Sequence, residues 1–133
     1  MLFLKNKLKE DRLASDQGYA HYEYELTRRI IIPLLRKWGI DFAGKKLLDI
    51  GCALGGSTVA FWENGSKSVG VDIEARYMKG AKIFAKKKEA NVSFVLTDIS
   101  TKKGKEGFEK QQIIILRDVI EHVPPERRKE LIV

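Results

Sequence analysis

The sequence contains a single cysteine and no apolar run long enough to cross a membrane. With only Cys52 present, an internal disulfide and a zinc cluster built from cysteines are excluded. A transmembrane helix needs roughly 18 consecutive apolar residues, and the apolar start Met1–Leu4 is followed at once by Lys5, Lys7 and Lys9. A secretory signal places its charges before a longer apolar stretch, so this order does not predict one. We therefore expect a cytoplasmic protein with no membrane partner and no metal site.

The composition is that of an ordinary globular domain with an excess of positive charge. The chain has 133 residues, enough for one domain, and its apolar and charged fractions are 44% and 32%. The formal net charge is +7, and the surplus lies mainly in clusters at 86–88, 102–105 and 127–129. Solvated helix faces and loops account for such clusters, and the alternative is an anionic partner such as RNA.

The first third of the chain has a helical pattern, which predicts an N-terminal helical segment over residues 1–44. Apolar residues recur at every fourth position between Gly18 and Gly39, and this spacing predicts the buried face of an amphipathic helix. We expect Pro33 to kink or restart this helix, Gly39 to end it, and Trp38 to lie in the core. The residues of the predicted face are Tyr22, Leu26, Ile30 and Leu34.

The remainder of the chain, residues 45–133, alternates between strand and helix patterns. Apolar runs predict strands over 46–50, 67–71, 92–96 and 113–116, and helices are predicted over 55–64 and 74–90. A further helix is predicted to open at Pro124-Pro125. Strands separated by such helices predict right-handed crossovers and a parallel sheet. The fold class expected is therefore α/β, a Rossmann-like, doubly wound sheet.

The end of the chain suggests that this sheet is incomplete, with about four strands. The last strand is continuous in Ile and Leu, which is typical of a central position. The last helix has only begun at Leu131-Ile132-Val133. We therefore expect the C-terminal part of the domain to be missing and the open sheet edge to promote self-association.

A glycine-rich turn follows the first predicted strand, in the run 47–56. Its acidic residue is Asp49, and Gly51 and Gly55 allow the backbone to approach a ligand closely. The following helix start supplies free N–H groups at the carboxyl end of a strand, where open α/β sheets bind ligands. A purely structural tight turn is the alternative.

Two further carboxylates follow the second and third predicted strands. Asp72 lies 23 residues after Asp49, and a carboxylate about 20 residues beyond such a turn can accept both hydrogen bonds of a ribose diol. Asp98 can accept from the exocyclic amine of adenine. The alternatives are a helix cap for Asp72 and a turn former for Asp98.

The segment Arg117–Val123 follows the fourth strand. Together with the three earlier motifs, in this order, it resembles the class I S-adenosylmethionine-dependent methyltransferases, over roughly 45–123. The run 48–52 resembles the first motif of that family, and 118–123 resembles the segment after the fourth strand in its small-molecule, ubiquinone-biosynthesis-type branch. A nicotinamide-binding Rossmann domain prefers G-x-G-x-x-G, which this sequence lacks.

The resemblance implies a role for each matching residue. The loop residues would line the methionine half of the cofactor, Asp49 would orient the loop, Asp72 would hold the ribose, and Asp98 with the Ile99 backbone would read the adenine. Arg117 would contact the methionine moiety through its backbone. Ala53 departs from the pattern, since the family usually has glycine there. The cofactor-binding residues implied are Asp49, Gly51, Cys52, Ala53, Gly55, Asp72, Ile73, Asp98, Ile99 and Arg117.

Methyl transfer needs a base only when the acceptor must lose a proton, and His122 is the candidate. The alternative for His122 is a structural role in the strand-to-helix turn. In this family N-terminal helices often cover the cofactor, so the cluster Tyr19–Tyr24 could form an active-site wall, although packing of the helix is the simpler interpretation. The resemblance implies a small-molecule methyl acceptor. RNA or protein acceptors, and a noncatalytic cofactor-binding fragment, remain alternatives.

Overall fold

The computed structural model describes residues 1–131, in which four α-helices, four strands and three π- or 3-10-helical segments follow one another. Residues 132 and 133, part of the apolar end noted above, lie outside the described residues. In chain order the elements are α1 (Leu2–Leu26), η1 (Thr27–Ile31), α2 (Ile32–Lys37), β1 (Lys46–Ile50), α3 (Gly56–Glu63), β2 (Lys67–Asp72), α4 (Ala75–Lys87), β3 (Ser93–Leu96), β4 (Ile113–Leu116), η2 (Ile120–His122) and η3 (Pro125–Leu131).

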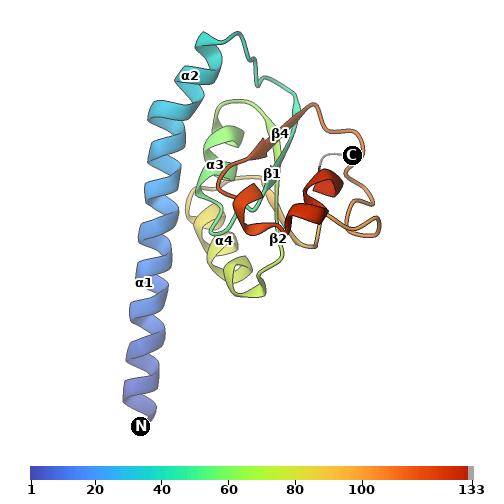
Figure 1. The fold of residues 1–133 in the computed structure, drawn as a ribbon. Helices are drawn as coiled ribbons and strands as arrows, with labels where there is room; N and C mark the ends of the chain where they lie inside the picture. The colour runs from blue at the N-terminus through green and yellow to red at the C-terminus, as the bar shows by residue number, and fades with distance from the viewer. Residues whose placement is uncertain (132–133) are drawn as a thin grey trace.

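The four strands form one parallel sheet in the order β3-β2-β1-β4. The chain runs outward from β1 through β2 to β3 and then returns to pair β4 with the other side of β1 (Figure 1). This reversal is the topological switch point at which doubly wound sheets bind ligands. The prediction of a Rossmann-like, doubly wound α/β sheet of about four strands is therefore confirmed. The central position expected for β4 is wrong within the described sheet, where β4 pairs only with β1 and forms an edge.

The two faces of the sheet have different covers. Helices α3 and α4 pack on one face, and α1 lies across them (Figure 1). Leu47, Val59 and Phe61 belong to the core on this side. On the other face, Leu48, Ile50 and Val71 pack against Ile99, while half-buried Phe108 from the loop after β3 joins them. This loop replaces a covering helix in the described part of the chain.

Helix α1 approaches α3 so closely that only glycine fits at the contact. A Cβ built on Gly56 would lie 2.0 Å from the Ala20 carbonyl oxygen. The Tyr24 hydroxyl donates a 2.5 Å hydrogen bond to Glu63 Oε2 at the other end of α3. Two contacts, one at each end of α3, therefore hold α1 in place. Beyond this contact the first turns of α1 extend away from the rest of the molecule (Figure 1).

The buried face of the N-terminal helix is not the one that the spacing predicts. Tyr22 and Ile30 are each 59% exposed, whereas Ala20, Tyr24 and Thr27 are buried. Ala20 and Tyr24 face α3, where Gly56 allows a close approach, and the π-helical turn η1 then interrupts the four-residue spacing ahead of Pro33. The predicted interruption near Pro33 is correct, and Gly39, with φ of 87°, follows the end of α2 as expected.

Three smaller expectations also need correction. Trp38 is 68% exposed, because the chain leaves α2 at that point and turns away from the core. The segment after Pro124 forms the 3-10 helix η3 and not an α-helix. Helix α4 ends at Lys87, three residues earlier than expected, because Glu89 adopts a left-handed backbone conformation with φ of 52°.

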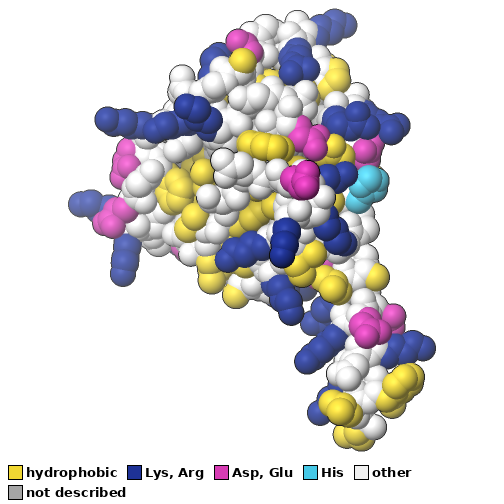
Figure 2. Space-filling model, turned by 180° about the vertical axis from the view of Figure 1, so that it is seen from behind, with side chains coloured by type: hydrophobic (Ala, Val, Ile, Leu, Met, Phe, Trp, Pro, Cys, Tyr) yellow, Lys and Arg dark blue, Asp and Glu magenta, His cyan; other side chains and the backbone are white. Residues whose placement is uncertain are grey.

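Lysine and arginine side chains project around the outline of the molecule, as Figure 2 shows for one face. At the tip of α1, exposed Leu2, Phe3 and Leu4 lie beside lysines (Figure 2). Within residues 1–131 we find no helix with the combined length and apolarity that a membrane span requires.

Candidate functional site

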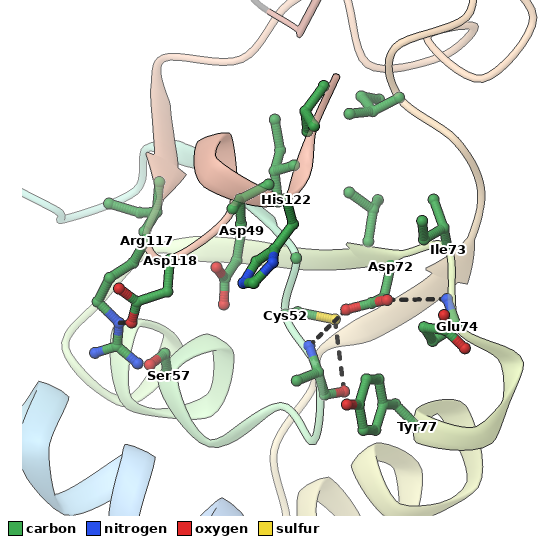
Figure 3. A pocket seen from close by; sticks show the side chains of 18 of the residues that line it. Asp49, Cys52, Ser57, Asp72, Ile73, Glu74, Tyr77, Arg117, Asp118 and His122 are labelled. Carbon is green, nitrogen blue, oxygen red and sulfur yellow. Dashed lines mark hydrogen bonds and ion pairs between the residues drawn. The ribbon is translucent and has the colours of Figure 1, made fainter. Parts of the chain in front are cut away.

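A cavity of about 700 Å³ opens at the carboxyl ends of the strands (Figure 3). Its walls come from the ends of β1, β2 and β4, from the loops after all four strands and from helix α1. The volume lies within the range of ordinary small-molecule sites. The sheet order brings together segments that are far apart in the sequence, since residues from Tyr19 to Arg127 line the same space.

The loop between β1 and α3 forms the floor of this cavity and is held by its backbone. The N–H groups of Gly51 and Cys52 both donate to the Val71 carbonyl oxygen, at 2.8 and 3.0 Å. Gly51 has φ of 73°, and a Cβ there would lie 2.4 Å from Val119 Cγ2. Gly55 has φ of 79°. Both glycines are therefore required by conformation.

Ala53 occupies the left-handed region as well, with φ of 45°. An L-residue with a Cβ is disfavoured there by about 1–2 kcal/mol. The Ala53 N–H donates a 2.9 Å hydrogen bond to Asp72 Oδ2, which fixes this conformation. The alanine that departs from the family pattern is therefore held in a strained backbone conformation.

Asp49 is buried beneath the loop, where its Oδ2 accepts a 2.7 Å hydrogen bond from the Thr58 hydroxyl. Burial raises the pKa of this carboxyl to about 6, and the negative charge of Asp72 adds to the rise. The hydrogen bond from Thr58 acts in the opposite direction. A carboxyl with such a pKa near a cavity is a typical functional-site feature, because a cationic ligand would restore its ionised form.

Asp72 ends β2 and connects two loops. Its Oδ2 accepts the Ala53 N–H, and its Oδ1 accepts the N–H of Glu74 at 2.9 Å, at the start of α4. The helix-capping alternative is thus present in the structure. Each carboxylate oxygen has further acceptor capacity, so capping and ligand binding are compatible. Ile73, the next residue, is 67% exposed at the cavity wall.

Asp98, after β3, is already engaged by protein groups. It accepts hydrogen bonds from the Ser100 hydroxyl at 2.6 Å and from the Ser100 N–H at 3.0 Å, and Arg127 pairs with it at 3.1 Å. The Ser100 hydroxyl is the largest cause of the lowered pKa of this carboxyl. The neighbouring Ile99 is buried. The sequence analysis did not identify Arg127 as a site residue, because no local pattern links η3 to the end of β3.

Cys52 and His122 differ sharply in exposure, although both line the cavity. Cys52 is buried, and this burial raises the pKa of its thiol, as do the nearby charges of Asp49 and Asp72. A thiol of this kind is a poor nucleophile at neutral pH. The His122 side chain is 78% exposed, and its Nε2 lies 3.8 Å from Glu121 Oε1. His122 is therefore free to meet a ligand at the mouth of the cavity.

Arg117 follows β4 and forms an ion pair with Glu23 of α1 through Nη2. Its Nη1 is buried and has no hydrogen-bond partner among the described residues. Its Nε lies 4.0 Å from Asp118 Oδ2. Figure 3 shows Arg117 and Asp118 on one side of Asp49, and Asp72 on the other. This agrees with the strand order, in which β1 lies between β4 and β2.

Helix α1 contributes more to the cavity than the sequence indicated. Tyr19 and Glu23 of α1 line it with Thr27, the first residue of η1, and the buried Thr27 hydroxyl forms a 2.7 Å hydrogen bond with the Ser57 hydroxyl. The aromatic cluster that suggested a wall contributes only Tyr19, since Tyr22 is 59% exposed. The spacing 19, 23, 27 on one helix could have indicated a shared polar face.

The charge of the cavity is opposite to that of the chain. Six acidic residues and three arginines line it, and all of the lysines of residues 1–131 lie elsewhere. The acidic residues are Glu23, Asp49, Asp72, Glu74, Asp98 and Asp118. The site is therefore suited to a ligand that carries positive charge. These acids do not form a metal centre, since no group of three His, Cys, Asp or Glu in the described part of the chain could hold an ion.

A family model described as a methyltransferase domain matches residues 41–128. The chain belongs to this methyltransferase family. The resemblance identified from the four motifs is thereby confirmed, and the matched range includes every residue assigned to the site from those motifs.

Several relatives and solved structures are similar to this methyltransferase domain. A ubiquinone biosynthesis O-methyltransferase of Nitrobacter winogradskyi is 35% identical over 81 residues, which is 61% of this chain and 30% of that protein. A second, of Bradyrhizobium, is 33% identical over 61% of this chain and 31% of its own length. The chain thus spans less than a third of these curated relatives.

Among solved structures, a Pyrococcus horikoshii protein has a TM-score of 0.68 and 27% identity, over 83% of this chain and 49% of that one. The magnesium protoporphyrin IX methyltransferase of Synechocystis, solved with bound SAH, has a TM-score of 0.66 and 22% identity, over 84% and 49%. At that identity the second comparison supports the fold alone. The methyltransferase sheet described above is therefore shared with both.

Proposed function

We propose that this domain binds S-adenosylmethionine and transfers its methyl group to a small-molecule acceptor. The observation that carries the proposal is the order of the groups along the sheet edge. The strand order β3-β2-β1-β4 places Asp98, Asp72, the glycine loop and Arg117 in one row. Adenine, ribose and methionine follow one another in the same order in the cofactor, so one extended ligand can meet each group that the motifs assigned to it.

The charge of the cavity supports the same ligand. S-adenosylmethionine carries a sulfonium and an ammonium group, and the acidic lining described above would favour both. Asp49 is on β1, between Asp98 at one end of the row and Arg117 at the other. Its carboxyl has a pKa of about 6. An adjacent cation would hold it in the ionised form.

Bound S-adenosylmethionine supplies an activated methyl group whose carbon is attacked as the bond to sulfur breaks. The residues of this chain position the reactants and exclude water. We propose that the carboxylate of Asp72 accepts the ribose hydroxyls, with Ile73 beside them. Where the acceptor is a hydroxyl, His122 at the mouth of the cavity would accept its proton as the oxygen–carbon bond forms.

A small-molecule acceptor is supported by the relatives named for ubiquinone biosynthesis. The confinement of lysine to the outer surface, away from the cavity lining, argues against RNA as the acceptor. A cytoplasmic location belongs to this proposal, since both the cofactor and such acceptors are available there.

A second candidate is a noncatalytic domain that binds the cofactor without transferring its methyl group. The strained conformation of Ala53 favours it, because glycine would adopt φ of 45° more readily at this position. The two candidates share the cofactor and differ only in chemistry.

Calorimetric titration with S-adenosylhomocysteine tests the proposal, with NADH as the control ligand. We expect one-to-one binding of S-adenosylhomocysteine and none of NADH. A folded chain that binds neither would contradict both candidates. If binding is found, incubation with methyl-labelled S-adenosylmethionine and a panel of phenols, carboxylic acids and RNA distinguishes an enzyme from a binding domain.

A further inference from the structure

Arg117 has a buried donor group for which the described chain offers no acceptor. Its guanidinium carries five N–H donors in a fixed plane. Nη2 is used by Glu23, while Nη1 is buried and unpartnered, and the Arg117 residue lines the cavity. A buried charged donor without an acceptor is unfavourable, and a ligand group that supplied the acceptor would remove this penalty.

The other two arginines at the cavity have no buried donor that lacks a partner in the described chain. Arg127 pairs with Asp98 and also contacts Ser100. Arg76 donates a 2.6 Å hydrogen bond to the Tyr77 hydroxyl and lies over that ring. Among the arginines of the cavity lining, Arg117 is therefore the one that would gain most from an anionic ligand group, because its buried Nη1 lacks an acceptor in the described chain.

The position of Arg117 in the row indicates which group that is. β1 separates it from Asp72, so the two side chains emerge from strands roughly 10 Å apart. If ribose is held at Asp72, the amino-acid end of the same ligand extends over β1 toward β4. The only anionic group of S-adenosylmethionine or S-adenosylhomocysteine, the α-carboxylate, lies at that end.

We propose that Arg117 binds the α-carboxylate of the cofactor through Nη1, while Glu23 of helix α1 holds the guanidinium through Nη2. This rests on the proposed function and gives the Arg117 side chain a role where the motif implied only its backbone. Glu23 is a positioning residue, and its side chain is 15% exposed. One guanidinium then connects the ligand to α1, so that the ligand stabilises the helix that covers it.

The test compares two ligands and three variants by calorimetry. The ligands are S-adenosylhomocysteine and its analogue that lacks the carboxylate. The variants are Arg117→Met, Glu23→Gln and the double variant, in which neither charge is left unpaired. The matched control is Glu25→Gln, because Glu25 is on the same helix but pairs with Arg28 and Arg29, away from the cavity.

We expect the wild-type chain to prefer S-adenosylhomocysteine over the analogue by about tenfold to a hundredfold. Arg117→Met and the double variant should lose this preference while binding the analogue as the wild type does. Glu23→Gln should reduce the preference severalfold, and Glu25→Gln should retain it. Hydrogen exchange adds a second readout, since amides around Glu23 should be protected more by S-adenosylhomocysteine than by the analogue, and equally by both in Glu23→Gln.

Equal binding of both ligands by the wild type would overturn this inference and leave the proposed function intact. The same holds if the double variant keeps the preference. A folded wild-type chain that binds neither ligand would overturn the proposed function and, with it, the inference.

Discussion

The Ala53 N–H donates to the Asp72 carboxylate at 2.9 Å, which connects the loop after β1 to the end of β2. Asp72 therefore has two tasks: it shapes the glycine loop and, in the proposed function, it holds the ribose. A substitution at Asp72 acts on both, and a careful choice of variant can separate them.

Replacing Asp72 should weaken cofactor binding. We expect Asp72→Asn to reduce affinity for S-adenosylhomocysteine by about 1–3 kcal/mol, because a charged acceptor for the ribose diol is lost. Asp72→Ala, which also removes the acceptor of the Ala53 N–H, should lower the melting temperature further. Calorimetry and thermal unfolding measure the two effects. Asp11→Asn, a change on the exposed part of α1, is the control, and unchanged affinity in Asp72→Asn would contradict the ribose role.

Asp49 should make stability and binding depend on pH in opposite directions. Its native pKa of about 6 lies above the ordinary value of 3.8, so the native state holds the proton more tightly than the unfolded state. The stability contributed by this group is therefore full below about pH 4 and is lost as the pH rises through about 6. Urea unfolding of the wild type and Asp49→Asn should differ progressively across this window, by up to about 2–3 kcal/mol.

Binding of a cationic ligand near Asp49 should instead strengthen as the pH rises through the same window, because the ionised carboxylate is the attractive form. S-adenosylmethionine, with its sulfonium, should show this dependence in the wild type and not in Asp49→Asn. A parallel pH profile in the two proteins would show that Asp49 does not face the ligand.

Gly56 should tolerate no side chain. In Gly56→Ala the added Cβ would collide with the Ala20 carbonyl, 2.0 Å away, so α1 must shift from α3. We expect a loss of about 2–4 kcal/mol in the free energy of unfolding. Gly18→Ala is the matched control, since a Cβ there meets nothing within 4 Å. Because Gly18 lies in the interior of α1, Gly18→Ala should raise the free energy of unfolding by about 0.5–1 kcal/mol. Effects of the same sign in the two variants would contradict the close packing of α1.

Ala53→Gly should relieve the strain in the cofactor loop. Glycine adopts φ of 45° without a Cβ penalty, so we expect stability to rise by up to about 1 kcal/mol and S-adenosylhomocysteine affinity to be kept or increased. Glu89→Gly makes the same exchange at φ of 52°, outside the cavity lining. Glu89→Gly should raise the melting temperature in thermal unfolding and leave the calorimetric affinity for S-adenosylhomocysteine unchanged. Weaker binding in Ala53→Gly would mean that the alanine methyl contributes to the site.

The strands and the glycine loop could be predicted because their signals are local. The apolar runs that end at Ile50 and Asp72 fix both the strands and the residues at their carboxyl ends. The pairing of Arg127 with Asp98, 29 residues earlier, could not be predicted, nor could that of Arg117 with Glu23. Both depend on how distant elements meet in space.

The position of β4 shows a second limit. An all-apolar strand predicts burial on both faces, yet Ile114 is 47% exposed at the sheet edge. The composition of a strand indicates how much burial the strand is suited to, and the described residues bury β4 only in part. The expected self-association through this edge stays a prediction, which light scattering of the wild type and Ile114→Lys would test.

The π-helical turn at Thr27–Ile31 acts as a rotational spacer. In a regular α-helix each residue advances by about 100°, so the one extra residue sets the angular phase of everything on its N-terminal side. Glu23 meets Arg117, and Ala20 meets Gly56, only in this phase. The geometry of the cavity wall thus depends on the length of this turn as well as on Thr27 and Ile31, the two of its residues that line the cavity. A one-residue deletion there would turn the polar face of α1 away from the site.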